Sequence, residues 1–510
     1  MKAKAIPYIN YLKILGIMAI FALPLFIFEC STDTYVLINE GLAEYSRLML
    51  SNGRVITALF FYLCGLIGCN VYVFYYISFT LSLVFSALAV YQLYIVLSGH
   101  FKKNTALILS FITVINPLSL EYFLFIEKGM FLLSILFITF AIRFYSKFLE
   151  GKSYYILLSS LFIMLSALIY QPLPALFVPI ALSLLLVKSR DTNQLIVDTV
   201  WTVFAYGLGM GLALAVNLTV GSSSRAGGTI YPSNILKALT IGTPLISVLV
   251  FLGVLIALFA ICIFTTKRES KIINSEVLFK FLKCSFIFLG TVLAIVLPFV
   301  FVNPEEVWLP LRIIYPLGAL IGALSIFLLG KSSIFTVSEK KEAALPKSRK
   351  SVRDNTGLSY GETEGTNGKK GKALVALSAV FIAFTFCLLQ AMFIGRVLNN
   401  KQDRELILKI GEEIAEYEKE SGIEIKYISI YYDREPTKSN PFVLKLGDSN
   451  VRALTKSWSD VNAINYYLGK DYEKLSPLLN VRLDYETYNW DSFDTEQLHF
   501  VDNTLHLCVY

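Results

Sequence analysis

The chain has 510 residues, of which 55% are hydrophobic and 16% are charged, and its mean hydropathy is +0.61. One water-soluble core cannot bury that much apolar surface, so the composition excludes an ordinary soluble protein and predicts a polytopic α-helical membrane protein. The net charge of +7 does not indicate a nucleic-acid ligand, because in membrane proteins basic residues mark the cytoplasmic ends of helices.

Apolar segments recur along the first 395 residues and predict about eleven transmembrane helices. We expect these spans near residues 10–28, 71–98, 105–120, 130–148, 154–170, 174–188, 196–220, 243–265, 281–302, 310–330 and 373–395. The stretch Val55 to Gly68 is apolar but short, and we interpret it as interfacial or re-entrant.

The distribution of Lys and Arg predicts the orientation of these spans. If Val55 to Gly68 does not cross the membrane, most basic residues fall on one side. The few on the other side are Arg47, Arg54, Lys128, Arg225, Lys237 and Arg312. The N-terminus is therefore expected in the cytoplasm and the C-terminal region outside it. Residues 331–372 are basic and poor in apolar side chains, which predicts a disordered cytoplasmic linker.

The tail after the last span, residues 396–510, predicts a small extracytoplasmic α/β domain. It begins with a helical pattern, RELILKIGEEIAEYEKESG, and continues with three strand-like runs, IEIKYISIYYD, VRLDYETY and LHFVDNTLHLCVY. Its acidic residues outnumber its basic ones, which excludes nucleic-acid binding. Four aromatic residues could stack on sugar rings, although core packing is the alternative role: Trp458, Tyr466, Tyr467 and Trp490.

Charged residues gather in the loop that follows the first span, Glu29 to Arg54. This loop carries Glu29, Asp33, Glu40, Glu44, Arg47 and Arg54. In the predicted orientation, other polar residues next to apolar sequence face the same side: Glu121, Glu127, Lys128, Tyr170, Gln171, Arg225 and Arg312. Charge so close to a membrane interior is costly, so we expect a functional site there.

Group transfer outside the cytoplasm has no nucleotide-activated donor, so it needs a donor carried by a lipid, such as a polyprenyl-phosphate sugar. A carboxylate must take the proton of the acceptor hydroxyl, and Asp33 is the candidate. The lipid phosphate that is released needs cations, for which the candidates are Arg54, Lys128, Arg225 and Arg312. Further candidates for substrate binding are Glu29, Glu40, Glu121, Tyr170 and Gln171.

Five short motifs resemble a known family: D-T-Y at 33–35, N-G-R at 52–54, N-P-x-x-x-E-Y at 116–122, Y-Q-P at 170–172 and P-L-R at 310–312. Their order and positions resemble those of the serotype-converting O-antigen glucosyltransferases (Gtr type II), within the GT-C class of membrane glycosyltransferases. The resemblance covers roughly residues 10–330. It implies a GT-C-like membrane domain over 1–330.

The resemblance also implies an activity and its location. Glucose would move from undecaprenyl-phosphate glucose to a cell-surface glycan such as O-antigen, on the outer face of the cytoplasmic membrane of a bacterium. The partners it implies are a flippase and an enzyme that charges the lipid. Because Asp33 is flanked by Thr32 and Thr34 rather than by a second acid, this loop alone is not expected to hold a metal ion, although Glu121 or Glu127 could complete a site. No metal ligand is assigned, and a divalent cation, Mg²⁺ or Mn²⁺, stays open.

Other interpretations stay open. A transporter or lipid-linked sugar flippase would also have many spans with polar residues inside, and a glycan polymerase or ligase would use similar chemistry. Single residues also have simpler roles: Asp33 could cap a helix, Gln171 could satisfy backbone groups at a helix break, and Arg312 could extend to the membrane interface. Glu40 and Glu44 could form surface ion pairs with Arg47.

Overall fold

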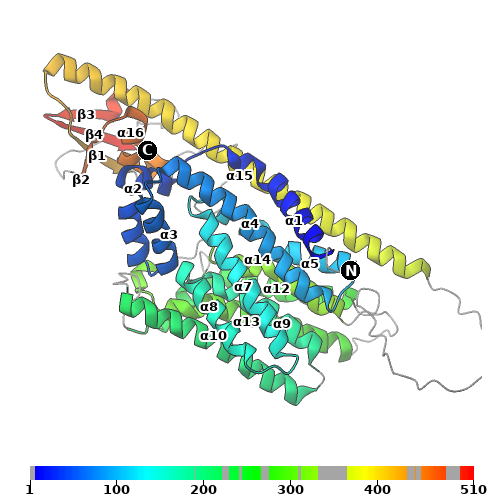
Figure 1. Ribbon diagram of the computed structural model, residues 1–510. Coiled ribbons are helices and arrows are strands. Elements are labelled where there is room, and N and C mark those ends of the chain that lie inside the picture. Colours follow the sequence, from blue (N-terminus) through cyan, green and yellow to red (C-terminus); the bar gives the residue numbers. More distant parts are fainter. Residues whose placement is uncertain are drawn as a thin grey trace, which may run out of the picture.

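The computed structural model describes residues 6–189, 191–220, 229–240, 244–265, 275–307, 312–330, 364–432, 443, 450–477 and 494–509. The molecule is a bundle of apolar helices with a small sheet at one end, as expected for a helical membrane protein (Figure 1). The N-terminal end of the first helix, α1 (Ile6–Ala22), and the sheet lie toward opposite ends of the bundle.

Within the described residues, six helical segments are long and apolar enough to cross a membrane: Ile9–Phe26, Val71–Ser98, Lys128–Phe148, Thr192–Val220, Ser275–Phe301 and Ala376–Ser421. A seventh candidate is a pair bent by 47°, Lys103–Val114 with Pro117–Leu124. The shorter apolar helices are Val55–Leu66, Tyr155–Ile169, Leu173–Lys188, Val248–Ile263 and Tyr315–Gly330. Each of the eleven predicted ranges overlaps one of these segments, while the number of membrane crossings stays a prediction.

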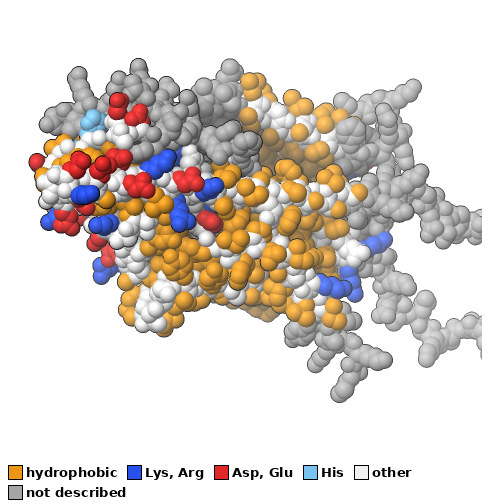
Figure 2. All heavy atoms as spheres, turned by 90° about the horizontal axis from the view of Figure 1, so that it is seen from above, with side chains coloured by type: hydrophobic (Ala, Val, Ile, Leu, Met, Phe, Trp, Pro, Cys, Tyr) orange, Lys and Arg blue, Asp and Glu red, His pale blue; other side chains and the backbone are white. Residues whose placement is uncertain are grey.

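The surface of the bundle agrees with a membrane environment. Large apolar side chains are exposed on several helices, among them α10 (Thr192–Val220), α12 (Pro244–Thr265) and α13 (Ser275–Val296). In Figure 2, hydrophobic side chains cover the middle of the visible face, acidic side chains are concentrated at the end that carries the sheet, and basic side chains appear at both ends. Exposing so much apolar surface is unfavourable in water but favourable in the lipid of a membrane.

Two helices between the first and second long spans form a separate layer beside the sheet (Figure 1). The first, α2 (Thr32–Ser51), is amphipathic and bends at Gly41, whose φ of 78° is in the left-handed region that favours glycine. The second, α3 (Val55–Leu66), packs against α2 and covers the predicted interfacial stretch. Phe61 of α3 stacks on Phe74 of α4 (Val71–Ser98), which joins this layer to the bundle.

The last helix, α15 (Glu364–Ser421), is one continuous element of 58 residues. At 1.5 Å per residue it is about 87 Å long, far more than a hydrocarbon core of about 30 Å requires. It runs from the end of the molecule that holds the N-terminus to the sheet (Figure 1). The predicted last span, 373–395, and the helix predicted to open the tail are therefore parts of one helix. No proline interrupts it, and it ends at Gly422, which has a φ of 70°.

The sheet has four strands in the order β2-β1-β4-β3. Strand β1 (Tyr427–Tyr432) is parallel to β2 (Glu473–Leu475) and to β4 (Thr504–Val509), and β3 (Leu498–Val501) forms an antiparallel hairpin with β4. Helix α16 (Asp460–Leu468) lies between β1 and β2 in sequence. The strands predicted in IEIKYISIYYD and LHFVDNTLHLCVY are confirmed, and VRLDYETY lies outside the described residues. We call α16 with the four strands the C-terminal unit.

The C-terminal unit shares a core with α15 and α2. Ile407, Ile410 and Ile414 of α15 pack with the strand residues Ile428 and Leu505. Cys30 and Tyr35 belong to the same buried cluster: Cys30 just precedes α2 and Tyr35 lies within it. In addition, the hydroxyl groups of Tyr35 and Tyr467 are 2.8 Å apart, and Asn39 Nδ2 donates to Asn462 Oδ1 at 2.8 Å. Residues 331–363 of the predicted linker lie outside the described residues, whereas residues 364–372, also predicted to be disordered, form the first turns of α15.

Candidate functional site

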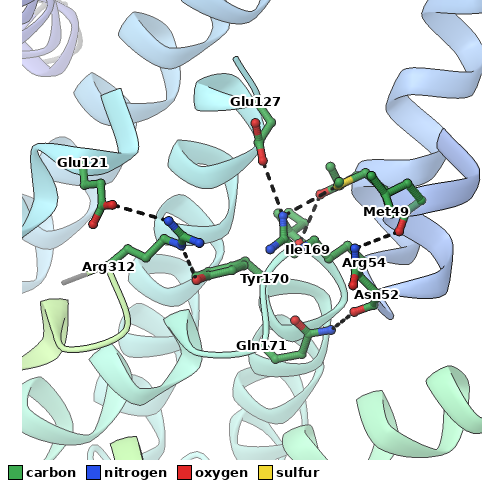
Figure 3. Close-up of polar contacts among 11 residues, drawn as sticks. Met49, Asn52, Arg54, Glu121, Glu127, Ile169, Tyr170, Gln171 and Arg312 are labelled. Atoms are coloured by element: carbon green, nitrogen blue, oxygen red, sulfur yellow. Dashed lines mark hydrogen bonds and ion pairs between the residues drawn. The ribbon is translucent and has the colours of Figure 1, made fainter. Parts of the chain in front are cut away.

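Polar residues from five separate parts of the sequence meet near one end of the bundle (Figure 3). Arg54 precedes α3, Glu121 opens the short helix α6 (Glu121–Leu124), and Glu127 precedes α7 (Lys128–Phe148). Tyr170 follows α8 (Tyr155–Ile169), and Arg312 lies before α14 (Tyr315–Gly330). All five residues belong to segments predicted to face the same side of the membrane, so the structure brings these segments together as expected.

Tyr170 is the centre of this cluster. Its hydroxyl accepts a hydrogen bond from Nε of Arg312 at 3.1 Å, and the guanidinium carbon of Arg54 lies 4.8 Å from the centroid of its ring. Each arginine also pairs with a glutamate: Nη1 of Arg54 is 3.4 Å from Oε1 of Glu127, and Nη1 of Arg312 is 3.4 Å from Oε1 of Glu121. We call these five residues the Tyr170 cluster (Figure 3).

The local sequence explains how Tyr170 and Arg54 are presented. Helix α8 ends before Pro172, because a residue that precedes proline favours an extended backbone. The next side chain, Gln171, donates from Nε2 to the carbonyls of Asn52 and Gly53 at 2.9 and 3.0 Å. Gln171 therefore stabilises the turn between α2 and α3 that positions Arg54. Its side chain is not used for the backbone groups that are left unpaired at the end of α8.

Gly53 allows this close contact. Its φ of 71° favours glycine, and a Cβ atom on it would lie 2.9 Å from Nε2 of Gln171. The N-G-R motif therefore forms a turn. Its shape depends on Gly53, and the turn determines where Arg54 lies.

Asp33 lies in the first turn of α2 and does not cap this helix. The cap is Ser31, which forms a capping box with Thr34. Asp33 is half-buried, and its carboxylate forms no hydrogen bond or ion pair with another residue of the part that the structure describes. The simpler role considered for Asp33, helix capping, is therefore performed by another residue.

Glu127 is an acid of the cluster whose surroundings shift its pKa. The pKa of its carboxyl is raised to about 7, first by burial and then by the nearby Asp33 carboxylate, while the Arg54 guanidinium opposes the shift. Its second oxygen, Oε2, is buried and has no hydrogen-bond partner among the described residues. Glu127 thus forms an electrostatically interacting pair with the Asp33 carboxylate, and its charge also interacts with that of Arg54. Glu127 was not among the predicted substrate-binding residues, although its position between two spans could have indicated it.

Glu29 lies at the other side of the first loop and contacts α15. Its Oε2 accepts a hydrogen bond from Nδ2 of Asn400 at 2.6 Å, and the same amide donates to the carbonyl of Cys30 at 3.0 Å. Arg396, one turn earlier on α15, is buried and donates to the carbonyl of Leu124. The sequence reasoning missed both α15 residues. The available signal was the polar pattern Arg396, Asn399, Asn400 and Asp403, which continues an apolar helix.

Two further predicted site residues, Lys128 and Glu40, are not part of the Tyr170 cluster. Lys128 is buried between helices, with Nζ 3.7 Å from the centroid of the Tyr75 ring. Glu40 is exposed on α2, next to its bend. Arg225 lies outside the described residues. On the exposed face of α2, Arg47 pairs with Glu44 at 2.6 Å, as the alternative interpretation of that helix expected.

The described part of the chain contains no group of three or more His, Cys, Asp or Glu side chains arranged to hold a metal ion. A divalent cation therefore stays an open prediction. No protein-family model matches the chain, and no curated protein matches its sequence. The resemblance to glucosyltransferases likewise stays a prediction.

Proposed function

We propose that the protein is a membrane glycosyltransferase that moves a sugar from a polyprenyl-phosphate donor to a cell-surface glycan. The sugar is expected to be glucose, the glycan a polymer such as O-antigen, and the location the outer face of a bacterial cytoplasmic membrane. The observation that carries the proposal is the arrangement of two arginines around Tyr170 beside the Asp33 and Glu127 carboxylates. The arginines supply the positive charge that the departing phosphate needs, and the carboxylates supply the negative charge that accepts a proton and stabilises the sugar ring in the transition state.

The two arginines suit a phosphate ligand. Each is mostly buried, with 13% and 15% of the side chains of Arg54 and Arg312 exposed. Their distances to the glutamates, 3.4 Å, exceed the roughly 2.7–2.9 Å of a strong charged hydrogen bond. Phosphate oxygens could therefore replace these weak contacts with shorter ones. Guanidinium groups also bind phosphate through two parallel N–H groups.

Asp33 suits the role of proton acceptor because it is the partly exposed member of the carboxylate pair. In the proposed step, the acceptor hydroxyl gives its proton to Asp33 while its oxygen bonds to C1 of the sugar. The bond between C1 and the phosphate oxygen breaks, and its electron pair stays on the phosphate. The arginines stabilise that developing charge, and the carboxylates stabilise positive charge on the sugar ring.

A lipid-linked sugar flippase is the second candidate. The observation that favours it is the 47° bend between α5 (Lys103–Val114) and the segment Pro117–Leu124, because transporters bind substrates at broken helices. This bent segment contains Glu121. A flippase would use the same arginines to bind the lipid phosphate but would break no glycosidic bond.

One assay separates the candidates. The purified chain is placed in vesicles with radiolabelled undecaprenyl-phosphate glucose on one side and an acceptor glycan, and label is followed in the glycan and on each side of the bilayer. Glycosyl transfer predicts label in the glycan. Label that changes sides while the donor stays intact would support the flippase, and a donor that neither moves nor reacts would contradict both. Appearance of longer glycans without use of the glucose donor would indicate a polymerase or ligase.

Variants test the site in the same assay. Arg54→Gln and Arg312→Gln should each lower kcat/KM for the donor by roughly tenfold or more, the effect of losing a hydrogen bond to a charged group. Arg47→Gln is the matched control, because Arg47 lies near the same loop but pairs with Glu44 on an exposed surface. Its kcat/KM should stay within about twofold of the native value. Equal losses in all three variants would contradict the proposed phosphate site.

A further inference from the structure

A strip of polar residues runs along one face of α15 where this helix leaves the apolar bundle. Its members are Arg396, Asn399, Asn400 and Asp403, at positions i, i+3, i+4 and i+7, so they share a face of the helix. Arg396, Asn399 and Asp403 are 5%, 3% and 0% exposed. Polar groups buried so completely need hydrogen-bond partners, and these partners show what the strip does.

The first part of the strip contacts both acidic segments of the candidate site. Arg396 donates from Nη1 to the carbonyl of Leu124, in the turn that begins at Glu121 and ends at Glu127. Its charge also interacts with those of Glu29 and Asp33. One helical turn later, Asn400 binds the Glu29 side chain and the Cys30 carbonyl, just before α2 begins.

The second part of the strip attaches α15 to the C-terminal unit and the segment that leads to it. Asn399 donates from Nδ2 to the carbonyl of Asn450 at 2.9 Å. Asp403 accepts hydrogen bonds from Nε of Arg452 at 2.7 Å and from the backbone N–H of Ala453 at 2.8 Å. Gly395 permits this packing, because a Cβ atom there would lie 2.8 Å from Nδ2 of Asn450.

We propose that Arg396 is a positioning residue that holds the turn from Glu121 to Glu127 against the Asp33 segment. The position of Arg396 itself is set by the C-terminal unit, which packs against α15. The inference rests on the proposed function, because it assigns a role in arranging that site. It also gives the C-terminal unit a role, since the unit fixes α15, and α15 fixes the distance between the two carboxylate-bearing segments. Arg396 suits its position because one planar guanidinium can bind a carbonyl and remain close to two acids.

Glycosyl transfer by the full chain gives the first test. Arg396→Gln should lower kcat at least tenfold with a smaller change in KM for the donor, because the known contacts of Arg396 are with the Leu124 carbonyl and the charges of Glu29 and Asp33 rather than with the donor phosphate site. Removing its positive charge should also shift the acid limb of the pH profile to higher pH, because the loss of a cation near carboxylates favours their protonated forms. Arg396→Lys keeps the charge and should restore the pH profile but only part of kcat.

Thiol labelling gives a second test that does not require activity. Cys30 is 5% exposed and is held by Asn400, whereas Cys508 is buried in the C-terminal unit. N-ethylmaleimide labelling, located by peptide mass spectrometry, should be at least fivefold faster at Cys30 in Arg396→Gln than in the native chain. Labelling at Cys508 should not change, because the effect is local. A rise at both cysteines would mean general unfolding and would overturn the proposal.

The matched control is Arg404→Gln, since Arg404 is an exposed arginine on the same helix. This variant should match the native chain in both tests. The positioning role is overturned if Arg396→Gln leaves Cys30 labelling within twofold of the native rate, or if it leaves kcat and the pH profile unchanged. If the native chain uses no donor, the proposed function is wrong, but this result does not decide the positioning role of Arg396. The labelling of Cys30 then decides whether Arg396 holds the two segments together.

Discussion

Nε of Arg312 donates a hydrogen bond to the hydroxyl of Tyr170 at 3.1 Å, although 142 residues separate them. Tyr170 follows α8 and Arg312 precedes α14, so this bond joins the ends of two distant helices (Figure 3). The ring of the same tyrosine contacts Arg54. One side chain thus sets the separation of the two cations that we assign to the donor phosphate.

The hydroxyl and the ring of Tyr170 can be tested separately. Tyr170→Phe keeps the ring under Arg54 but removes the hydrogen bond to Arg312, so kcat/KM for the donor should fall roughly tenfold, mostly through KM. Tyr170→Leu removes both contacts and should lower kcat/KM for the donor further. The control is Tyr154→Phe, an exposed tyrosine before α8 that should leave kcat/KM unchanged. Equal activity of Tyr170→Phe and the native chain would show that the hydroxyl does not position Arg312.

The raised pKa of Glu127 predicts how stability depends on pH. Between its ordinary value of 4.5 and its folded value of about 7, the folded chain binds a proton that the unfolded chain does not. The free energy of unfolding should therefore fall as the pH rises through this window, by at most on the order of 1 kcal/mol per pH unit. Glu127→Gln should flatten this slope, as measured by thermal unfolding in detergent.

Glu44→Gln is the control for that measurement, because Glu44 is an exposed acid paired with Arg47 on α2. It should keep the native slope. If Glu127→Gln and the native chain lose stability equally between pH 4.5 and pH 7, Glu127 is not the group that takes up the proton.

The close packing of α4 and α7 supports the turn that carries Glu127. A Cβ atom on Gly129 would lie 2.9 Å from the carbonyl oxygen of Ser78, which belongs to the backbone and cannot move by itself. Gly129→Ala should therefore lower the free energy of unfolding by about 1–3 kcal/mol. Gly211→Ala on α10 has open space around the added methyl group and should be close to neutral. Equal stability of both variants in a denaturant titration would contradict this packing.

The ion pair between Asp403 and Arg452 is almost completely buried, with a distance of 2.7 Å. Asp403→Asn removes the buried charge that faces Arg452 at this short distance, so the free energy of unfolding should fall by about 3 kcal/mol. The comparison is Lys401→Gln, which breaks the exposed pair of Lys401 with Glu405 at 3.8 Å and should change stability by less than about 1 kcal/mol. A neutral Asp403→Asn would mean that the C-terminal unit is held to α15 by apolar packing alone.

The sequence predicted the helical class and the gathering of the outer segments because both follow from simple physical patterns. Long apolar runs predict helices in lipid, and the bias of Lys and Arg sorts their connecting loops to two sides. Arg54, Glu121, Tyr170 and Arg312 were therefore expected near one another. Which arginine pairs with which glutamate could not be predicted, since contacts across 73 and 191 residues leave no local pattern.

The role of α15 was missed for a different reason. Hydropathy measures only how long an apolar run is, so the predicted span ended at residue 395, one position before Arg396. The following polar residues were assigned to the extracytoplasmic α/β domain, because sequence alone does not show that Leu124, Cys30 and Ala453 supply their partners. The same limit applies to Lys128, whose position on a tyrosine ring depends on how α4 and α7 pack.

Asp33→Asn gives the most direct test of the proposed glycosyltransferase. Purified native and variant chains, shown to be equally folded by their thermal unfolding, are supplied in lipid with undecaprenyl-phosphate glucose and an acceptor glycan. We predict that the native chain transfers glucose and that the variant loses at least about a hundredfold in kcat, because a neutral amide cannot take the acceptor proton. Native kcat in the variant would contradict the role of Asp33, and a native chain that consumes no donor would contradict the proposed function.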